Sequence, residues 1–435
     1  MMFDYLLILV VLFLVGTGIF CIYSSGINAD GFLVTNEYQK QIIWAVVGFV
    51  LMILLTVYDY RRLEKKSIYL FVLLIFLLLY TLLFGKYVNG AKSWIGIGSF
   101  GIQVSEFGKI IFILFLSSFL DKTLNKNQLK RYALSIVILF IPLSLILIQP
   151  DLGTAVVYIP IFLVMCFMAN IPIKYLLYSI LLGALSIIFT ILPIWNSEIS
   201  PKTYSAILVL NNDKMRLFLV IVLSIIAIIG FIIRRYFHSP KYIEVISIIL
   251  TICSLSLCFS YVLGKVLKDY QIKRLIIFMN PQVDPQGAGW NIIQSQIAIG
   301  SGGLFGQGYL QGTQSHYRFL PEQSTDFIFS ILSEEFGFVG CIIIFILYLI
   351  ILLRILFVIK KCNTKYGTYI CSGILALFSY HFFINVGMVM GIMPITGIPL
   401  LFLSYGGSSL VTSMCCVGFV MSIEYRKTRI NKSLV

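Results

Sequence analysis

The stretch FLPEQSTDFIFSILSEEFG, residues 319–337, changes from polar to strongly apolar at Phe327 and then places Glu334 and Glu335 inside the apolar run. Acidic side chains within a membrane segment are costly and usually face a polar interior. The stretch therefore predicts a helix that enters a membrane just after Asp326. One of the two glutamates would line a cavity or bond a neighbouring helix.

The composition extends this prediction to the whole chain. Of its 435 residues, 59% are hydrophobic and only 11% are charged, and the mean hydropathy is +0.98. A soluble domain is about a quarter charged. Apolar runs long enough to cross ~30 Å of hydrocarbon recur, and their backbone must satisfy its own hydrogen bonds, so they are expected to be helices. The predicted fold is an all-α, polytopic integral membrane protein.

We expect twelve membrane spans. They are Phe3–Ile22, Ile42–Tyr58, Ile68–Phe84, Ile102–Leu120, Tyr132–Ile148, Leu152–Ile171, Tyr175–Trp195, Leu217–Ile233, Val245–Leu263, Phe327–Leu353, Tyr369–Met390 and Leu401–Ile423. Lys and Arg gather in the even-numbered loops, which indicates that these loops and both termini face the cytoplasm. The odd-numbered loops then face outward, among them residues 85–101 and 264–326, and Ile292–Ile299 in the second could form a short helix. Such long loops usually carry function.

The net charge of +14 does not indicate nucleic-acid binding, because the positive residues lie in short loops, as expected for a membrane protein. The nine cysteines lie mostly within apolar runs and form no CxxC pair, which is typical of small core residues. The three histidines are far apart and show no metal-ligand spacing.

Asp326 is the principal candidate for chemistry, and two interpretations of it stand side by side. It could simply begin the helix, with Ser324 or Thr325 capping the free N–H groups. A carboxylate at a membrane mouth beside apolar walls is also a good general base, because burial brings its pKa toward the working pH.

Further polar residues are expected near the same outer surface. Glu106 and Lys109, at i and i+3 on one helix face, form either a self-neutralising pair or a contact for phosphate. Trp94 is a membrane-interface anchor or a platform for a sugar or lipid, Asp151 lies in a very short outer turn, and Arg274 in an outer loop suits phosphate. In addition, GIMPITGIPLLFLSYGGSSL, residues 391–410, mixes Pro and Gly into apolar sequence. It predicts broken helices that line a cavity.

These motifs together resemble a known family. The matching stretches are NGAKSWIGIG, IQVSEFGK, QPDLGT, KRLIIFMNPQVDPQGAGW, IIQSQIAIGSGGLFGQG, GTQSHYRFLPEQSTDFIF, EEFGFVG and NVGMVMGIMPITGIPLLFLSYGGSS. In this order and over most of the chain, the sequence resembles the SEDS proteins (shape, elongation, division and sporulation), and the RodA branch more than the FtsW branch.

The resemblance implies a peptidoglycan glycosyltransferase that polymerises lipid II at the outer, periplasmic face of the bacterial cytoplasmic membrane during cell elongation. It implies a class B penicillin-binding protein as transpeptidase partner, together with other membrane proteins of the elongation complex. The family's essential aspartate falls on Asp326, which would deprotonate the acceptor sugar in an inverting transfer.

By the same resemblance, further residues would surround the outer cavity. Lys109 and Arg274 are expected to meet pyrophosphate, and the others are Trp94, Glu106, Asp151 and, ranked lower, Glu335. A divalent cation, Mg²⁺ or Mn²⁺, is compatible with the pyrophosphate.

Three departures from the family pattern bear on this reading. Ser324 replaces a frequent histidine before the Thr-Asp pair, and Gln307 replaces a common lysine. The family has ten spans, so we expect an inserted helical hairpin at residues 197–241 within one transmembrane domain, residues 1–435.

Two other functions remain open from the sequence. A flippase that moves lipid II across the membrane would also need intramembrane charge and broken helices, but no base at the outer mouth. A scaffold that only recruits a synthase would need none of the charged residues.

Overall fold

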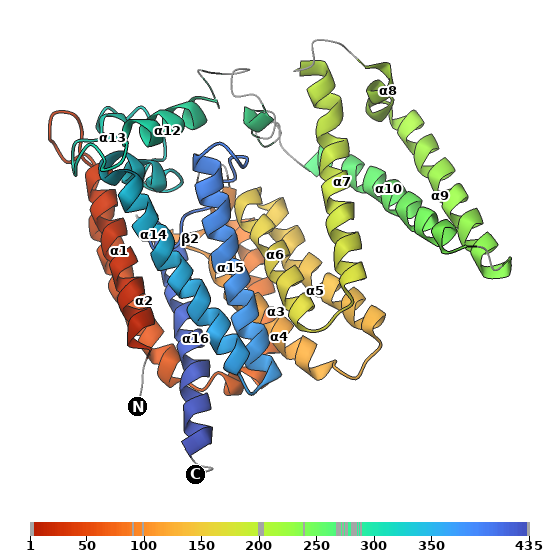
Figure 1. Ribbon diagram of the computed structural model, residues 1–435, viewed down its shortest axis with the longest axis horizontal. Helices are drawn as coiled ribbons and strands as arrows, with labels where there is room; N and C mark the ends of the chain where they lie inside the picture. Colours follow the sequence, from red (N-terminus) through yellow and green to blue (C-terminus); the bar gives the residue numbers. More distant parts are fainter. Residues whose placement is uncertain are drawn as a thin grey trace. The chain divides into compact units, whose positions relative to one another are not determined.

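The computed structural model describes residues 4–88, 91–97, 100–198, 204–237, 240–266, 271, 274, 277–279, 285, 287 and 289–432. A long helix lies at each of the twelve predicted spans (Figure 1). These helices are α1 Tyr5–Ser25, α2 Glu37–Val57, α3 Arg61–Phe84, α4 Val104–Lys122, α5 Gln128–Ile148, α6 Leu152–Met168, α7 Ile173–Glu198, α9 Asp213–Tyr236, α10 Lys241–Val266, α14 Ile328–Lys361, α15 Lys365–Val389 and α16 Gly407–Lys432.

Ten of these helices are long and apolar enough to cross a membrane in the described part of the chain. The two others are α6, which is apolar but has only 17 residues, and α4, which carries Glu106 and Lys109. The multi-pass membrane fold is thus confirmed, whereas the crossing of the membrane by all twelve helices stays a prediction.

The chain forms two compact units, residues 1–171 with 289–435, and residues 172–288. The second unit contains α7, a single turn α8 (Ser205–Leu208), the short 3₁₀ turn η1 (Val209–Asn211), α9 and α10, and α10 packs against both α7 and α9. The predicted insertion at 197–241 lies within this unit. The described residues of this predicted insertion contain one helix of spanning length, α9. A pair of helices there would need α7 or α10 as its second member.

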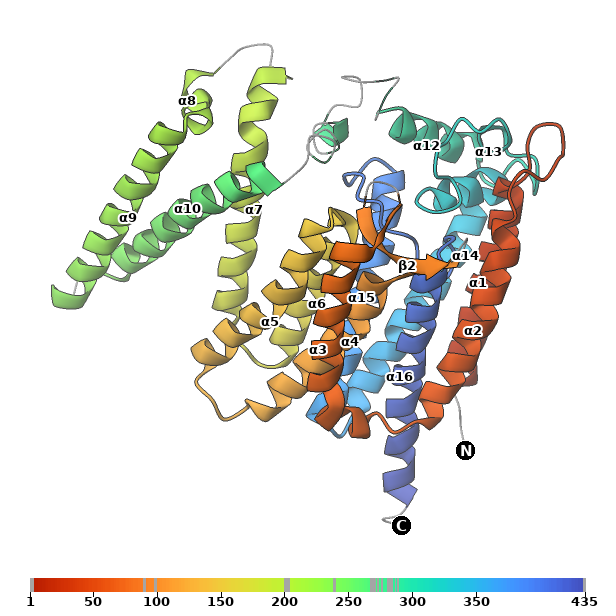
Figure 2. The same cartoon turned by 180° about the vertical axis from the view of Figure 1, so that it is seen from behind.

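In the first unit, α16 packs along α2, and the start of α1 and the end of α16 lie at the same end of the unit (Figures 1 and 2). Two shorter helices, α12 (Trp290–Ser301) and α13 (Thr313–His316), lie at the opposite end. α12 confirms the short helix predicted at Ile292–Ile299 in the long outer loop. The rest of that predicted loop, residues 264–326, lies partly outside the described residues.

The predicted loop at residues 85–101 contains a three-stranded antiparallel sheet, which the sequence analysis did not anticipate. Its strands are β1 Lys86–Val88, β2 Ala91–Ile97 and β3 Phe100–Gln103, with β2 in the middle. The Asn-Gly pair at residues 89–90 is a strong hairpin signal in the sequence and could have predicted β1 and β2. The sheet leads directly into the first residue of α4.

α14 is broken at Gly337, whose φ of +63° is outside the helical region. The break frees backbone groups on both sides, and the glycine-rich loop after α12 pairs with them. The amides of Gln307 and Gly308 donate to the carbonyls of Glu334 and Glu335, and the amides of Phe338 and Val339 donate to the carbonyls of Gly303 and Leu304. A kink in a membrane helix is tolerated because a neighbouring segment satisfies the freed groups.

Residues 390–406, between α15 and α16, form an unwound segment whose apolar residues Leu400–Leu403 are buried. Gly391, Gly397 and Phe402 have positive φ, which a helix cannot accommodate. The predicted last span, Leu401–Ile423, is therefore wrong at its start, because regular helix begins only at Gly407.

Four carbonyl groups of the unwound segment accept hydrogen bonds from side chains of three helices. Ile398 accepts from Asn385 and Pro399 from His381, both of α15; Leu401 accepts from Tyr348 of α14, and Ser404 from Gln41 of α2. The break predicted from its Pro and Gly residues is confirmed, whereas the cavity that it was expected to line stays a prediction.

Gly337→Ala should destabilise the protein, because an added Cβ would collide with the backbone of Gly306 and an alanine at this φ is strained. We expect a loss of about 2–4 kcal/mol, measured as a lower unfolding temperature of the detergent-solubilised protein. Gly300→Ala is the matched control, since nothing lies within 4 Å of its added Cβ. Equal unfolding temperatures for the two variants would contradict this account of the kink.

Candidate functional site

A buried ion pair lies near the start of α4. The ammonium of Lys109 is 2.7 Å from Glu106 Oε1, and Lys109 is only 1% exposed. Its other neighbour is His381 of α15, with 3.3 Å between Lys109 Nζ and His381 Nε2. The second oxygen of Glu106 is buried and has no hydrogen-bond partner among the described residues. The i,i+3 ion pair, one of the two interpretations of the sequence, is present, and the contact of Lys109 with phosphate stays a prediction.

Asp151 lies beside this pair and caps a helix. Its carboxylate accepts hydrogen bonds from the backbone amide and the hydroxyl of Thr154 in the first turn of α6, at 3.2 and 2.8 Å. It also accepts from Gln103 Nε2 at 2.7 Å and Ser105 Oγ at 3.2 Å. Asp151 therefore ties the start of α6 to the start of α4, where Glu106 follows Ser105.

Trp94 is placed near the start of α4 by the three-stranded sheet. It lies on β2 opposite Gln103 of β3, and its half-buried ring covers Gly101, where an added Cβ would be 2.9 Å from the indole. The structure thus brings together Trp94, Glu106, Lys109 and Asp151, four of the predicted site residues.

Asp326 lies in the turn just before α14 and is half-buried. Its backbone is fixed on both sides: its amide donates to Glu322 O at 3.1 Å, and its carbonyl accepts from Asn385 Nδ2 at 2.8 Å. Ser324 O, two residues earlier, accepts from the amide of Tyr405 in the unwound segment. Hydrogen bonds therefore tie the backbone of Asp326 and its turn to α15 and to the unwound segment.

The predicted capping of α14 by Ser324 or Thr325 is wrong. The N-cap of α14 is Phe327, without a side-chain cap bond, and the hydroxyl of Thr325 donates to Glu322 O instead. The carbonyl of Glu322 also accepts hydrogen bonds from the backbone amides of residues 325–327. These amides are therefore satisfied within the turn, and the regular helix begins only after it.

Glu334 and Glu335 are both buried and both bond neighbouring segments. Glu334 Oε1 accepts from Thr313 Oγ1 and from the amide of Gln314, at 3.1 and 2.8 Å. Glu335 accepts from Ser24 Oγ of α1. The second oxygen of each is buried without a partner in the described part of the chain. Glu335 therefore anchors the α1–α14 contact, and no described contact joins it to Lys109.

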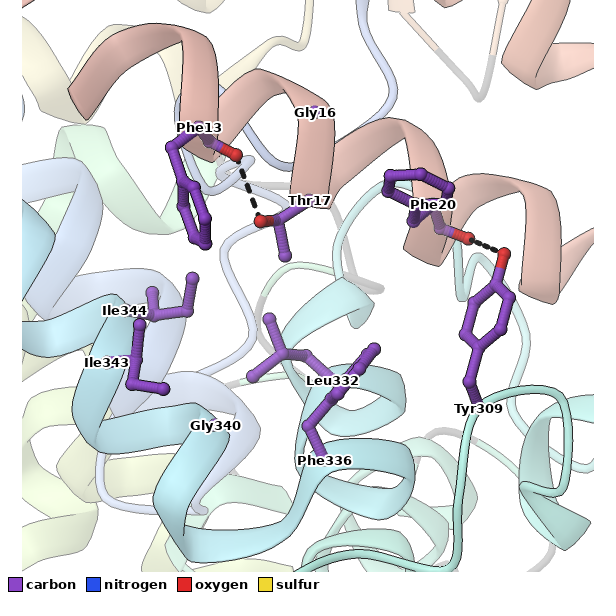
Figure 3. A pocket seen from close by; sticks show the side chains of 10 residues that line it. All are labelled: Phe13, Gly16, Thr17, Phe20, Tyr309, Leu332, Phe336, Gly340, Ile343 and Ile344. Carbon is purple, nitrogen blue, oxygen red and sulfur yellow. Dashed lines mark hydrogen bonds between the residues drawn. The ribbon is translucent and has the colours of Figure 1, made fainter. Parts of the chain in front are cut away.

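Next to this contact, α1 and α14 enclose an apolar groove of about 460 Å³ (Figure 3). Its lining residues are Phe13, Gly16, Thr17, Phe20, Tyr309, Leu332, Phe336, Gly340, Ile343 and Ile344. The Tyr309 hydroxyl donates to Phe20 O at 3.3 Å. Burial, with a smaller effect of Glu335, raises the pKa of Tyr309 to about 12, so this hydroxyl remains a donor at neutral pH.

Arg274, the remaining predicted site residue, belongs to the second compact unit and is half-buried there. Its predicted contact with pyrophosphate stays a prediction. No group of three or more His, Cys, Asp or Glu side chains that could hold a metal ion occurs among the described residues.

Two residues near the site were missed by sequence reasoning. His381 and Asn385 are fully buried on α15 and bond the unwound segment, and His381 also contacts Lys109. A signal was present, because polar residues inside an apolar membrane run usually face a functional interior.

Fold and site together define a class: a multi-pass helical membrane protein with a buried ion pair, a rigidly held aspartate and a broken helix that connects them. A family model described as "Cell cycle protein", named for FtsW, RodA and SpoVE, matches residues 4–200 and 204–429. The chain therefore belongs to the FtsW/RodA/SpoVE family, and the resemblance seen in its motifs is confirmed.

Curated relatives match along nearly their whole length. The chain is 52% identical to the peptidoglycan glycosyltransferase RodA of Treponema pallidum (strain Nichols), covering 98% of each chain. It is 32% identical to the peptidoglycan glycosyltransferase MrdB of Escherichia coli (strain K12), covering 91% of this chain and 88% of that protein.

Solved structures share the fold. One is a chain from work described as "Structural coordination of polymerization and crosslinking by a peptidoglycan synthase complex", with a TM-score of 0.69, 23% identity, and coverage of 98% of this chain and 99% of that chain. Another is the rod shape determining protein RodA of Thermus thermophilus, with a TM-score of 0.61, 21% identity and 98% coverage of each chain.

Lys109→Met should destabilise the protein by about 3–5 kcal/mol, because it leaves the Glu106 carboxylate buried without its cation. The double variant Glu106→Gln with Lys109→Met removes both charges and should recover most of that loss. The unfolding temperatures of the solubilised variants measure the difference. A single variant as stable as the double variant would mean that the pair is not energetically coupled.

Proposed function

We propose that this chain is a peptidoglycan glycosyltransferase that polymerises lipid II, with Asp326 as general base. The observation that carries the proposal is the backbone of Asp326, fixed by hydrogen bonds just before α14, in a chain 52% identical to a relative named as such an enzyme. Both the family and the geometry of the turn support it.

The proposed reaction is an inverting displacement. Asp326 takes the proton of the acceptor GlcNAc 4-hydroxyl, whose oxygen forms a bond to the anomeric carbon of the MurNAc donor. The bond from that carbon to the pyrophosphate oxygen breaks, and undecaprenyl pyrophosphate leaves. A base must be within hydrogen-bond reach of its proton, and a fixed backbone contributes to that geometry. Because Ser324 precedes the Thr-Asp pair, the proton then passes from Asp326 to water.

The neighbouring residues would supply binding rather than proton transfer. Trp94 pairs with Gln103, which bonds Asp151, and offers a ring on which a sugar can pack. The apolar groove between α1 and α14 suits an isoprenoid chain. The ammonium of Lys109 already contacts Glu106 and His381. A pyrophosphate bound by Lys109 would share the ammonium with these two residues. The contacts proposed for Arg274 and Glu335 remain part of the same hypothesis.

A magnesium or manganese ion would take its ligands mainly from the pyrophosphate, because the described residues offer no group of three metal ligands.

The proposed partner is a class B penicillin-binding protein, supported by the similarity to a chain of a peptidoglycan synthase complex. We also propose that the site faces outward from the cytoplasmic membrane, and that the chain acts with other elongation-complex proteins in cell elongation. The flippase alternative is not favoured, since the curated relatives are named as glycosyltransferases.

Asp326→Asn should lower polymerisation of lipid II by roughly 100-fold or more, because it removes the base and keeps the shape of the side chain. The assay is glycan-strand formation by the purified chain with its penicillin-binding partner. Glu322→Gln is the control, since it neutralises an exposed carboxylate in the same turn and should remain within about threefold of wild type. Full polymerisation by Asp326→Asn would refute the proposed base. Lipid II transport into liposomes without polymerisation would favour the flippase.

A further inference from the structure

His381 and Asn385 are two buried polar residues that the proposed reaction leaves without a role. They are four residues apart on α15, so they share one helix face, and they are 1% and 0% exposed. Burying an amide or imidazole in a membrane helix is costly unless its hydrogen bonds are made. The hydrogen bonds of the two side chains therefore explain why these residues can be buried on α15.

The contacts of His381 allow one protonation pattern. Nδ1 is 2.9 Å from Pro399 O, and a carbonyl can only accept, so Nδ1 carries the hydrogen. Nε2 is 3.3 Å from the Lys109 ammonium, which can only donate, so Nε2 carries the lone pair. A neutral imidazole with its hydrogen on Nδ1 satisfies both contacts and links α4 to the unwound segment.

Asn385 makes the next link. Its side-chain nitrogen donates to Ile398 O and to Asp326 O, both at 2.8 Å. A primary amide has two N–H donors, and both are used here on backbone carbonyls. The side-chain oxygen of Asn385 has no partner in the described part of the chain. The amide thus acts as a clamp between the residue of the candidate base and the unwound segment.

The two links meet at consecutive residues, Ile398 and Pro399. A continuous path of side-chain bonds and one peptide unit therefore runs from the Glu106–Lys109 pair, through His381 and Asn385, to the backbone of Asp326. Every member of this path lies in the first compact unit.

We propose that His381 and Asn385 are positioning residues, which set the place of the Asp326 carboxylate relative to the Lys109 ammonium. This inference rests on the proposed glycosyl transfer. Neither residue has to touch substrate. His381 acts through Lys109 and the backbone of the unwound segment, and Asn385 acts through that segment and the backbone of Asp326. A displacement of about 1 Å in a catalytic group can cost on the order of 100-fold in rate.

The test compares His381→Leu, Asn385→Leu and His381→Gln in lipid II polymerisation with the penicillin-binding partner present. Each leucine variant should lower kcat by about 10–100-fold and leave KM for lipid II within about threefold. Glutamine can donate to Pro399 O and accept from Lys109, so His381→Gln should recover most of the activity. The double leucine variant should lose little more than either single variant, because residues that act as a unit are non-additive.

His316→Leu is the matched control. His316 is also a buried histidine whose Nδ1 bonds a backbone carbonyl, that of Ile27 at 3.0 Å, but it lies outside the path. It should retain kcat within about threefold. An effect as large as that of His381→Leu would mean a general packing role and would overturn the proposal, as would failure of His381→Gln to rescue.

The failure of the inference is distinguishable from the failure of the proposed function. If the wild-type chain does not polymerise lipid II, the function fails. If the wild type and His316→Leu polymerise and His381→Leu does so equally well, only the positioning role fails.

A second measurement does not depend on the leucine variants. The chain has three histidines, so a ¹⁵N-histidine NMR spectrum is simple, and the His381 signal is the one lost in His381→Gln. We expect hydrogen on Nδ1 and none on Nε2. Hydrogen on Nε2 would break the contact with Lys109 and overturn the proposal even if the leucine variants do not fold.

Discussion

The described architecture of the first unit depends on one constraint: backbone carbonyls that leave a helix inside a membrane protein need new hydrogen-bond donors. Between α15 and α16 the chain is unwound and buried, and water cannot supply these donors at low cost. His381, Asn385, Tyr348 and Gln41 supply them from three helices. The unwound segment thereby becomes the point at which these helices are tied together.

The candidate site follows from this arrangement. Asn385 bonds the unwound segment and Asp326 with the same nitrogen, and His381 bonds the segment and Lys109 with its two ring nitrogens. A second break, at Gly337 of α14, is satisfied differently, by backbone hydrogen bonds with the glycine-rich loop near residue 306. The break between α15 and α16 thus exposes polar backbone groups, and one of the side chains that bond these groups, that of Asn385, also bonds the backbone of Asp326, the candidate base.

The sequence predicted some parts of this well because their signals are local. Hydropathy located all twelve helices, and the i,i+3 spacing of Glu106 and Lys109 predicted their ion pair. The start of α16 was misplaced, because the apolar residues Leu401–Leu403 read as helix although they are buried in an unwound segment. The caps expected for α14 were wrong, since the carbonyl of Glu322 gathers the amides instead.

The sequence by itself determined the membrane class, the positions of the helices and the motifs that point to the family. Composition and the length of the apolar runs suffice for the class and the helices, because the hydrophobic effect and backbone hydrogen bonding act along short stretches of chain. The family follows from the resemblance of the motifs. Only the tertiary structure decided that Asp151 caps α6 beside Glu106, and that Asn385 reaches Asp326 across 59 positions of sequence. Such bonds depend on which helices are neighbours, and the packing of distant segments is not encoded in the spacing of residues within any one of them.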